Sequence, residues 1–111
     1  AVSCLFCKIA AGEIPASIVH TSDRIVACND IDPQAPVHVL VVPKEHHDNI
    51  AELTRANPAL AAELMTVAAA VGTAHPDGFR VVLNTGSDGG QSVNHVHAHV
   101  LAGRGLAWPP G

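Results

Sequence analysis

The sequence predicts an α+β domain in which a five-stranded, mainly antiparallel sheet is combined with one long helix and a short N-terminal helix. The chain has 111 residues, of which 48% are hydrophobic, so it can bury one core without cross-links. Five runs of β-forming residues are separated by turn-forming residues, and one longer segment has apolar residues at helical spacing. We therefore expect a single domain over residues 1–111, with one face of the sheet covered by the long helix.

The first half of the chain is expected to form a short helix followed by three strands. The helix occupies residues 4–11 and ends before Gly12 and Pro15, because glycine favours a helix C-terminus and proline does not continue a helix. The strands are expected at residues 17–20, 24–29 and 37–42. The last of these is a continuous apolar run, typical of a strand buried on both faces. Residues 30–36 contain two prolines and form a loop.

The second half is expected to form the long helix, over residues 57–75, and two further strands. Asn57 can cap this helix, and Pro58 suits its first position. The apolar residues at helical spacing are Leu60, Leu64, Val67 and Val71. The strands are expected at residues 79–84 and 95–102. Between His47 and Pro58 the sequence shows no pattern that assigns an element.

The composition argues against two classes of partner. The formal net charge is -4, from 6 basic and 10 acidic side chains, so the chain lacks the cationic surface that binds nucleic-acid phosphates. The most apolar tract, residues 59–74, is interrupted by Glu63, and no signal-like segment opens the sequence; we expect a soluble, cytoplasmic protein without a membrane partner. Three cysteines, two of them spaced as Cys4-x-x-Cys7, favour metal or redox chemistry over a structural disulfide.

Eight histidines are the unusual feature of the composition, and three of them alternate in GGQSVNHVHAHVL, residues 89–101. Alternate residues of a strand share a face, so His95, His97 and His99 are expected on one face of the sheet. The small apolar residues between them are expected to pack against the long helix: Val96, Ala98 and Val100. The row can be a catalytic site, a His-x-His zinc site, or an exposed strand with incidental histidines.

The segment that joins the last two strands favours a phosphate site. It has the sequence GSDGGQS, residues 86–92, and glycines let the backbone N–H groups of a loop, here around Gly90 and Gln91, approach an anion closely. The Ser92 hydroxyl and the Asn84 amide can add neutral donors. Such a loop is by itself more often a plain turn, but beside three histidines it indicates phosphate chemistry.

These motifs resemble a known family. HVHAHVL matches the signature of the histidine triad (HIT) superfamily of nucleotide hydrolases and transferases. The stretch NTGSDGGQSVNHVHAHVLAGRGLAWPPG looks like the Hint branch of that superfamily, the purine nucleoside phosphoramidases. FCKIAAGEIPASIVH and DIDPQAPVHVLVVPKEH also fit Hint, so the resemblance covers nearly the whole chain.

The resemblance implies a role for each residue around the phosphate. The middle histidine of the family is the nucleophile, so His97 would attack the α-phosphorus and form a nucleotidyl-imidazole intermediate. His99 would donate to a phosphate oxygen, and Ser92 would contact the phosphate and assist departure of the amine. Asn84 matches an amide that contacts the nucleotide. His38 matches a histidine near the phosphate, although a lone histidine on a buried strand is equally often a satisfied core residue.

The resemblance also implies a nucleoside site. Asp30 matches an acidic residue that accepts hydrogen bonds from the ribose hydroxyls. Apolar positions around the purine are matched by Phe6, Ile14 and Ile31. For Phe6 and Ile14 a plain core role is an equal alternative. Gly90 and Gln91 are assigned to the same substrate site.

Cys4 and Cys7 need two further ligands to complete a tetrahedral zinc site. Many members of the family supply them from the histidine after the third strand and from the first histidine of the triad, here His46 and His95, with His47 as an adjacent competitor for the first role. The resemblance therefore implies a structural zinc ion. The alternative is an empty site in which His95 is hydrogen-bonded locally.

The favoured function is hydrolysis of the P–N bond of purine nucleoside 5'-phosphoramidates by a homodimer that needs no catalytic cofactor. The nearest rival is cleavage of dinucleoside polyphosphates or adenylylated metabolites at a P–O bond. From a different class, the chain can be a zinc-bearing interaction module whose hydrolase activity is secondary.

Overall fold

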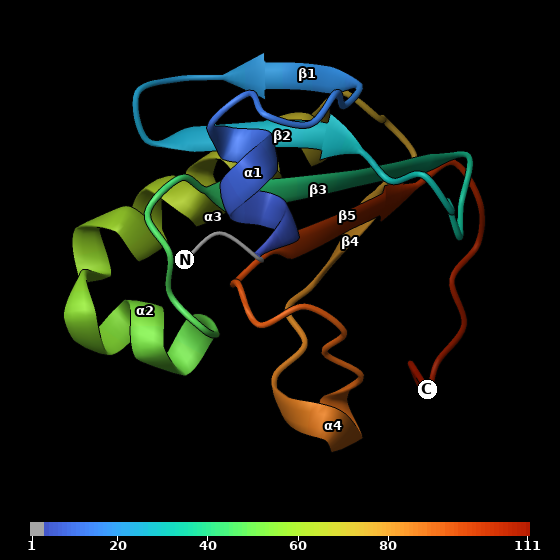
Figure 1. Ribbon diagram of the computed structural model, residues 1–111. Coiled ribbons are helices and arrows are strands. Elements are labelled where there is room, and N and C mark those ends of the chain that lie inside the picture. The colour runs from blue at the N-terminus through green and yellow to red at the C-terminus, as the bar shows by residue number, and fades with distance from the viewer. Residues whose placement is uncertain (1–3) are drawn as a thin grey trace.

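The computed structural model describes residues 4–111 and contains one five-stranded antiparallel sheet with helices on both of its faces (Figure 1). The strands are β1 Ile18–Thr21, β2 Ile25–Asn29, β3 Val37–Pro43, β4 Phe79–Val82 and β5 Ala98–Ala102. The helices are α1 Leu5–Ala10, α2 Ile50–Ala56, α3 Pro58–Thr73 and α4 Gly86–Gly89. The strand order is β1-β2-β3-β5-β4, and every neighbouring pair is antiparallel. The predicted fold class is confirmed.

The long helix α3 begins and packs as its sequence predicts. The side chain of Asn57 accepts a hydrogen bond from the N–H of Leu60, and Pro58 occupies the first turn, where its missing N–H leaves no partner unsatisfied. The helix residues buried against the sheet are Leu60, Ala61, Leu64 and Ala68. They pack with strand residues that include Ile25, Val39, Val41, Ala98 and Val100. This cluster is the main hydrophobic core.

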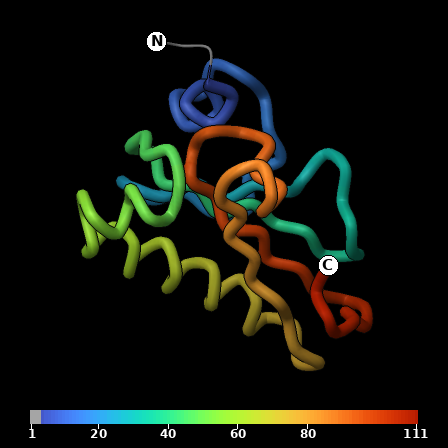
Figure 2. The backbone as a smooth tube through the Cα atoms, turned by 90° about the horizontal axis from the view of Figure 1, so that it is seen from below, coloured from blue at the N-terminus to red at the C-terminus, as the bar shows by residue number. Residues whose placement is uncertain are grey.

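The opposite face of the sheet is also partly covered, so the expectation of a single covered face was wrong. Figure 2 shows α1 on the side of the sheet opposite α3. Phe6 of α1 is buried in a second cluster that contains Val26, Cys28, Leu40 and Val42. Because successive side chains point to opposite faces, apolar residues at consecutive positions of β2 and β3 supply both clusters.

Several local features differ from the sequence-based expectation; one is the end of β4, which lies at Val82 rather than at residue 84. α2 fills the unassigned segment before Pro58; Asn49 caps it by accepting the N–H of Glu52, and Leu53 is fully buried in the main core. β5 begins at Ala98 rather than His95, because its pairing with β3 ends at the partners Val41 and Ala98. The described loop before β5 also contains α4, a single helical turn.

Gly72 is the one glycine of α3, and it lies against the side chain of Phe79. A Cβ atom added there would overlap the ring of Phe79. Gly72→Ala should therefore destabilise the protein by about 1–2 kcal/mol, because overpacking outweighs the intrinsic helix preference of alanine. In a Phe79→Ala background the overlap is gone, and the same change should stabilise by up to about 1 kcal/mol. Urea unfolding of the wild type, the two single variants and the double variant tests this. If Gly72→Ala changes the free energy of unfolding in the same direction in both backgrounds, the explanation by overlap is contradicted.

Candidate active site and metal site

The three alternating histidines have different hydrogen-bond partners, and these partners assign the tautomer of each ring. A neutral imidazole has one N–H and one bare nitrogen, so a nitrogen that faces a carbonyl oxygen must carry the proton. His97 Nδ1 donates to the main-chain oxygen of His95 at 2.8 Å, which leaves His97 Nε2 with a free lone pair. The ring is 6% exposed and packs on Phe6, with ring centroids 4.7 Å apart. His97 therefore presents a bare, oriented nitrogen.

His99 carries its ring proton on the other nitrogen than His97 does, because the Nδ1 atom of His99 faces His38. The N–H of Gln34 donates to His38 Nδ1 at 3.0 Å, so the proton of His38 is on Nε2. His38 Nε2 lies 2.9 Å from His99 Nδ1, which must accept that proton's hydrogen bond. The proton of His99 is consequently on Nε2. The ring centroids of His97 and His99 are 4.9 Å apart, so a bare nitrogen and an N–H donor lie side by side.

Both histidines line an apolar cleft of about 290 Å³ between α1, β2 and the segment before β5. This volume is near the lower end of the roughly 300–1,000 Å³ common for small-molecule sites. The expected residues that line it are Phe6, Ile14, Asp30, Ile31, Ser92, His97 and His99. Phe6 is buried, whereas Ile31 is fully exposed and lies at the rim. Cys28 and Leu40 also line the cleft, and no pattern in the sequence distinguishes Leu40 from a core residue.

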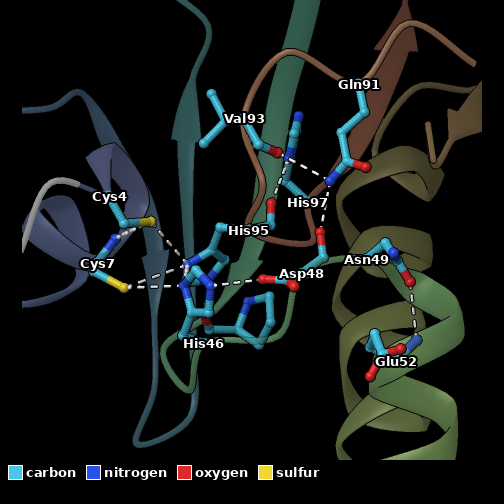
Figure 3. A network of polar contacts seen from close by, with 11 residues as sticks. Cys4, Cys7, His46, Asp48, Asn49, Glu52, Gln91, Val93, His95 and His97 are labelled. Carbon is cyan, nitrogen blue, oxygen red and sulfur yellow. Dashed lines mark hydrogen bonds and ion pairs between the residues drawn. The ribbon is translucent and has the colours of Figure 1, made fainter. Parts of the chain in front are cut away.

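Four other residues expected around the substrate lie outside this cleft: His38, Asn84, Gly90 and Gln91. Asn84 lines a separate hollow that His38 and His99 also line. The N–H of Gly90 donates to Ser87, and that of Gln91 to Gly86. The Gln91 side chain accepts from the N–H of Gly86 and donates to the main-chain oxygens of Val93 and Asp48 (Figure 3). Gly90 and Gln91 therefore hold the loop that carries Ser92, instead of offering these groups to a phosphate as expected.

His99 is held in its neutral form. Burial, followed by the charges of His97 and His38, lowers its pKa from 6.5 to about 4. The charge of Asp30 acts in the opposite direction, and its carboxylate lies 3.3 Å from His38 Nε2. At neutral pH the ring is therefore a hydrogen-bond donor without a charge.

This shift predicts how stability depends on pH. The pKa of His99 is lower in the folded protein, so as the pH falls the unfolded chain is protonated at His99 before the folded protein is. The contribution of neutral His99 to the free energy of unfolding is therefore complete above pH 6.5 and is lost as the pH falls toward 4. His99→Gln should make the free energy of unfolding less steep between pH 6.5 and 4. Denaturant titrations of both proteins across that range measure the difference; parallel curves would contradict the assignment.

A second cluster is formed by Cys4, Cys7, His46 and His95, whose ligand atoms lie within 4.8 Å of one another (Figure 3). Cys4 is the N-cap of α1 and Cys7 lies one turn later, so the helix places both sulfurs on the same side. His95 Nε2 donates to the main-chain oxygen of Pro43 at 2.8 Å, and His46 Nε2 lies 3.1 Å from Asp48. These partners leave the Nδ1 atoms of both histidines bare and facing the sulfurs.

The spacing of these atoms is compatible with zinc. The two Nδ1 atoms are 3.1 Å apart, Cys4 Sγ is 3.3 Å from His95 Nδ1, and Cys7 Sγ is 3.3 Å from His46 Nδ1. A tetrahedral zinc ion with ordinary bond lengths places nitrogen pairs at about 3.3 Å and nitrogen–sulfur pairs at about 3.6 Å. Two bare nitrogens at this separation repel each other unless a cation lies between them. The donor set therefore fits a four-coordinate metal ion.

The structure also distinguishes His46 from its neighbour. His47 Nε2 lies 2.6 Å from a carboxylate oxygen of Glu45, and the main-chain oxygen of His47 accepts the N–H of Val96. Its ring is not part of the Cys4 cluster. Of the two candidates, the structure brings His46 to the cysteines.

A further group of possible metal ligands does not fit a metal ion. It consists of Asp30, His38 and His99. A metal bound to His38 Nε2 would require the remaining proton to be on Nδ1, and Nδ1 already accepts the N–H of Gln34. Two donors would then face each other at 3.0 Å. This cluster is a hydrogen-bonded connection to His99.

The fold and the site together define a small α+β protein of the histidine-triad type. Of the three alternating histidines, His97 and His99 line a cleft and His95 belongs to a cluster of possible metal ligands. A family model, described as the HIT domain, matches residues 11–106. The chain belongs to the HIT domain family. None of the helices in residues 4–111 is long and apolar enough to cross a membrane.

The chain is similar to several known proteins over almost its whole length. It is 47% identical to an uncharacterised HIT-like protein of Synechococcus elongatus over 109 residues, 96% of each chain. It is 41% identical to the 14 kDa zinc-binding protein of Zea mays over 112 residues, covering 96% of this chain and 87% of the other. The crystal structure of a HIT family hydrolase from Legionella pneumophila shares 45% identity with a TM-score of 0.93, covering 98% of this chain and 100% of the other. These likenesses support a HIT-family, hydrolase-like protein.

Proposed function

We propose that this protein hydrolyses the P–N bond of purine nucleoside 5'-phosphoramidates and releases AMP or GMP and an amine. The observation that carries the proposal is the pair formed by the bare Nε2 of His97 and the Nε2–H of His99 beside an apolar cleft. A bare nitrogen can attack phosphorus, and a neutral donor next to it can stabilise the charge that develops on a phosphate oxygen.

The reaction proceeds in two steps. His97 Nε2 forms a bond to the α-phosphorus while the P–N bond to the leaving group breaks, and the departing nitrogen takes up a proton from solvent water through the exposed Ser92 hydroxyl at the cleft. Water then attacks the phosphorus and breaks its bond to His97; the proton that this water loses returns to solvent, and the nucleoside monophosphate leaves with the bare imidazole restored. The main-chain oxygen of His95 keeps the Nδ1 proton of His97 in place through both steps.

The remainder of the cleft supports a purine nucleoside as the substrate. Phe6 and Ile14 provide apolar walls for the base, and Ile31 lies at the rim. The Asp30 carboxylate lines the same cleft and can accept hydrogen bonds from ribose hydroxyls. Asn84 lies on the other side of His99, where its amide can contact the phosphate or the leaving group.

The proposal is tested by comparing adenosine and guanosine 5'-phosphoramidate with diadenosine tetraphosphate. We expect rapid release of AMP or GMP from the phosphoramidates and little turnover of the tetraphosphate. Preferred cleavage of the tetraphosphate would favour the P–O alternative. No turnover of any of these substrates would overturn both hydrolase functions.

We also propose that Cys4, Cys7, His46 and His95 hold a structural zinc ion. Four protein ligands leave no open position for substrate, so zinc would connect α1 to the segment before β5 without entering the reaction. The zinc-binding protein of Zea mays among the relatives supports this assignment.

We further propose that the protein functions as a homodimer. Exposed, mostly small side chains recur along one side of α3, and Met65 is 39% exposed among them. A face of this kind permits close approach of a second copy. Sedimentation equilibrium tests the proposal, and a monomer at micromolar concentration would contradict it.

A further inference from the structure

Arg104 lies just after β5, outside the cleft, and each of the three nitrogens of its exposed guanidinium group donates a hydrogen bond. Its Nε and Nη2 donate to the main-chain oxygen of Gln34 at 3.0 and 2.9 Å, and its Nη1 donates to the main-chain oxygen of Gly105 at 2.8 Å. Two N–H groups of one rigid fork on one carbonyl oxygen define the position of that oxygen. Arg104 therefore holds the loop at residues 30–36 through its backbone.

A second contact fixes the same loop to the end of β5. Gly103 has φ +93°, a conformation that favours glycine, and a Cβ atom there would lie 2.9 Å from Pro36 Cβ. The Gly103 backbone thus packs closely on Pro36 while Arg104 holds Gln34. The loop is restrained at two points by residues that follow β5.

The position of Gln34 bears on which of two arrangements His38 and His99 adopt. In the first, His38 Nε2–H donates to His99 Nδ1, and His99 presents an N–H at Nε2. In the second, the proton of His38 is on Nδ1, His99 Nδ1–H donates to His38 Nε2, and His99 presents a lone pair. The Gln34 N–H at 3.0 Å from His38 Nδ1 favours the first arrangement, and the Asp30 carboxylate 3.3 Å from His38 Nε2 favours it as well. A lone pair at His99 Nε2 would repel a phosphate oxygen instead of binding it.

We infer that Arg104 is a positioning residue that keeps His99 in its donor tautomer through the sequence of contacts from Gln34 to His38. Arg104 does not line the cleft, and its contact with the loop is to the Gln34 backbone. The consequence for catalysis rests on the proposed function. The consequence for the tautomer of His99 does not, because it exists in the free protein.

The direct test is a long-range ¹H–¹⁵N NMR spectrum of the histidine rings, which distinguishes Nδ1–H from Nε2–H tautomers without any substrate. Wild-type His99 is expected as the Nε2–H form, and Arg104→Ala should add a population with the proton on Nδ1. Arg104→Lys should restore part of the original form, because one ammonium donor can still reach the Gln34 oxygen. In phosphoramidate hydrolysis, Arg104→Ala should lower kcat about tenfold to a hundredfold with a smaller change in KM.

Two variants separate this role from a general loss of stability. Arg80 also donates to main-chain oxygens, those of Leu106 and Ala107, but not to the loop at residues 30–36. Arg80→Ala should leave the His99 tautomer unchanged. Gln34→Ala removes only a side chain that donates to Asp32 and keeps both backbone groups, so it should behave like the wild type.

An unchanged His99 tautomer in a folded Arg104→Ala protein would overturn the inference, whatever its activity. If the wild type does not cleave phosphoramidates, the proposed function fails, and the NMR comparison still decides the role of Arg104.

Discussion

His97→Ala is expected to lower kcat/KM for adenosine 5'-phosphoramidate by at least about 10⁴-fold, because it removes the nitrogen that forms the covalent intermediate. No other described residue offers a bare imidazole nitrogen to the cleft, since His99 presents an N–H there. Steady-state release of AMP measures the loss. In the wild type, quenching during turnover with denaturant at alkaline pH, where a P–N bond to imidazole survives, followed by peptide mass spectrometry should find AMP attached to His97.

His20→Ala provides the matched control, because His20 is an exposed histidine on β1 that does not line the cleft. It should retain wild-type activity. Substantial turnover by a folded His97→Ala protein, or a nucleotide adduct on another residue, would exclude His97 as the nucleophile.

Removal of zinc is expected to produce the largest loss of stability. A ligand that binds only the folded state at a thousand times its Kd contributes about 4 kcal/mol. For a domain of this size, that corresponds to a decrease in Tm of roughly 15 °C. Calorimetry before and after treatment with a chelator measures the change, and elemental analysis should find one zinc ion per chain beforehand.

Cys7→Ser should reproduce the effect of the chelator, whereas His47→Gln should not, because His47 pairs with Glu45 and lies outside the cluster. Activity should also decrease when zinc is removed, since the main-chain oxygen of His95, a proposed ligand, orients His97. Less than about half an equivalent of zinc in the gently purified wild type, or an unchanged Tm after chelation, would contradict the structural role of the metal.

Most of the fold could be predicted because its signals are local. Asn57 and Pro58 mark the start of α3 by their own chemistry, and alternation predicted that Val96, Ala98 and Val100 would face α3. α2 was missed because seven residues, with Leu53 as the one fully buried side chain, give too short an apolar pattern to recognise. The start of β5 was misplaced because its pairing with β3 ends at Val41 and Ala98, and the local pattern of residues 95–97 does not reveal where a ladder with another strand ends.

The residues of the candidate site could be predicted from their types, but the hydrogen bonds between them could not. The spacing of the three histidines separated them from the small apolar residues of the same segment. No local pattern, however, links Gln34 to His38 Nδ1, or Arg104 to Gln34 across 70 positions of the chain. Contacts of this kind depend on how a loop is placed, and many loop positions are compatible with one sequence pattern.

By itself, the sequence determined the α+β class, the residues able to bind metal or attack phosphorus, and the resemblance to the histidine triad superfamily, because these depend on side-chain chemistry and on spacing along the chain. Only the tertiary structure decided that His46 rather than His47 faces the cysteines. It also decided that His95, His97 and His99 present a bare Nδ1, a bare Nε2 and an Nε2–H, respectively. The proton of an imidazole is located by the partner of its other nitrogen, and that partner is brought there by folding.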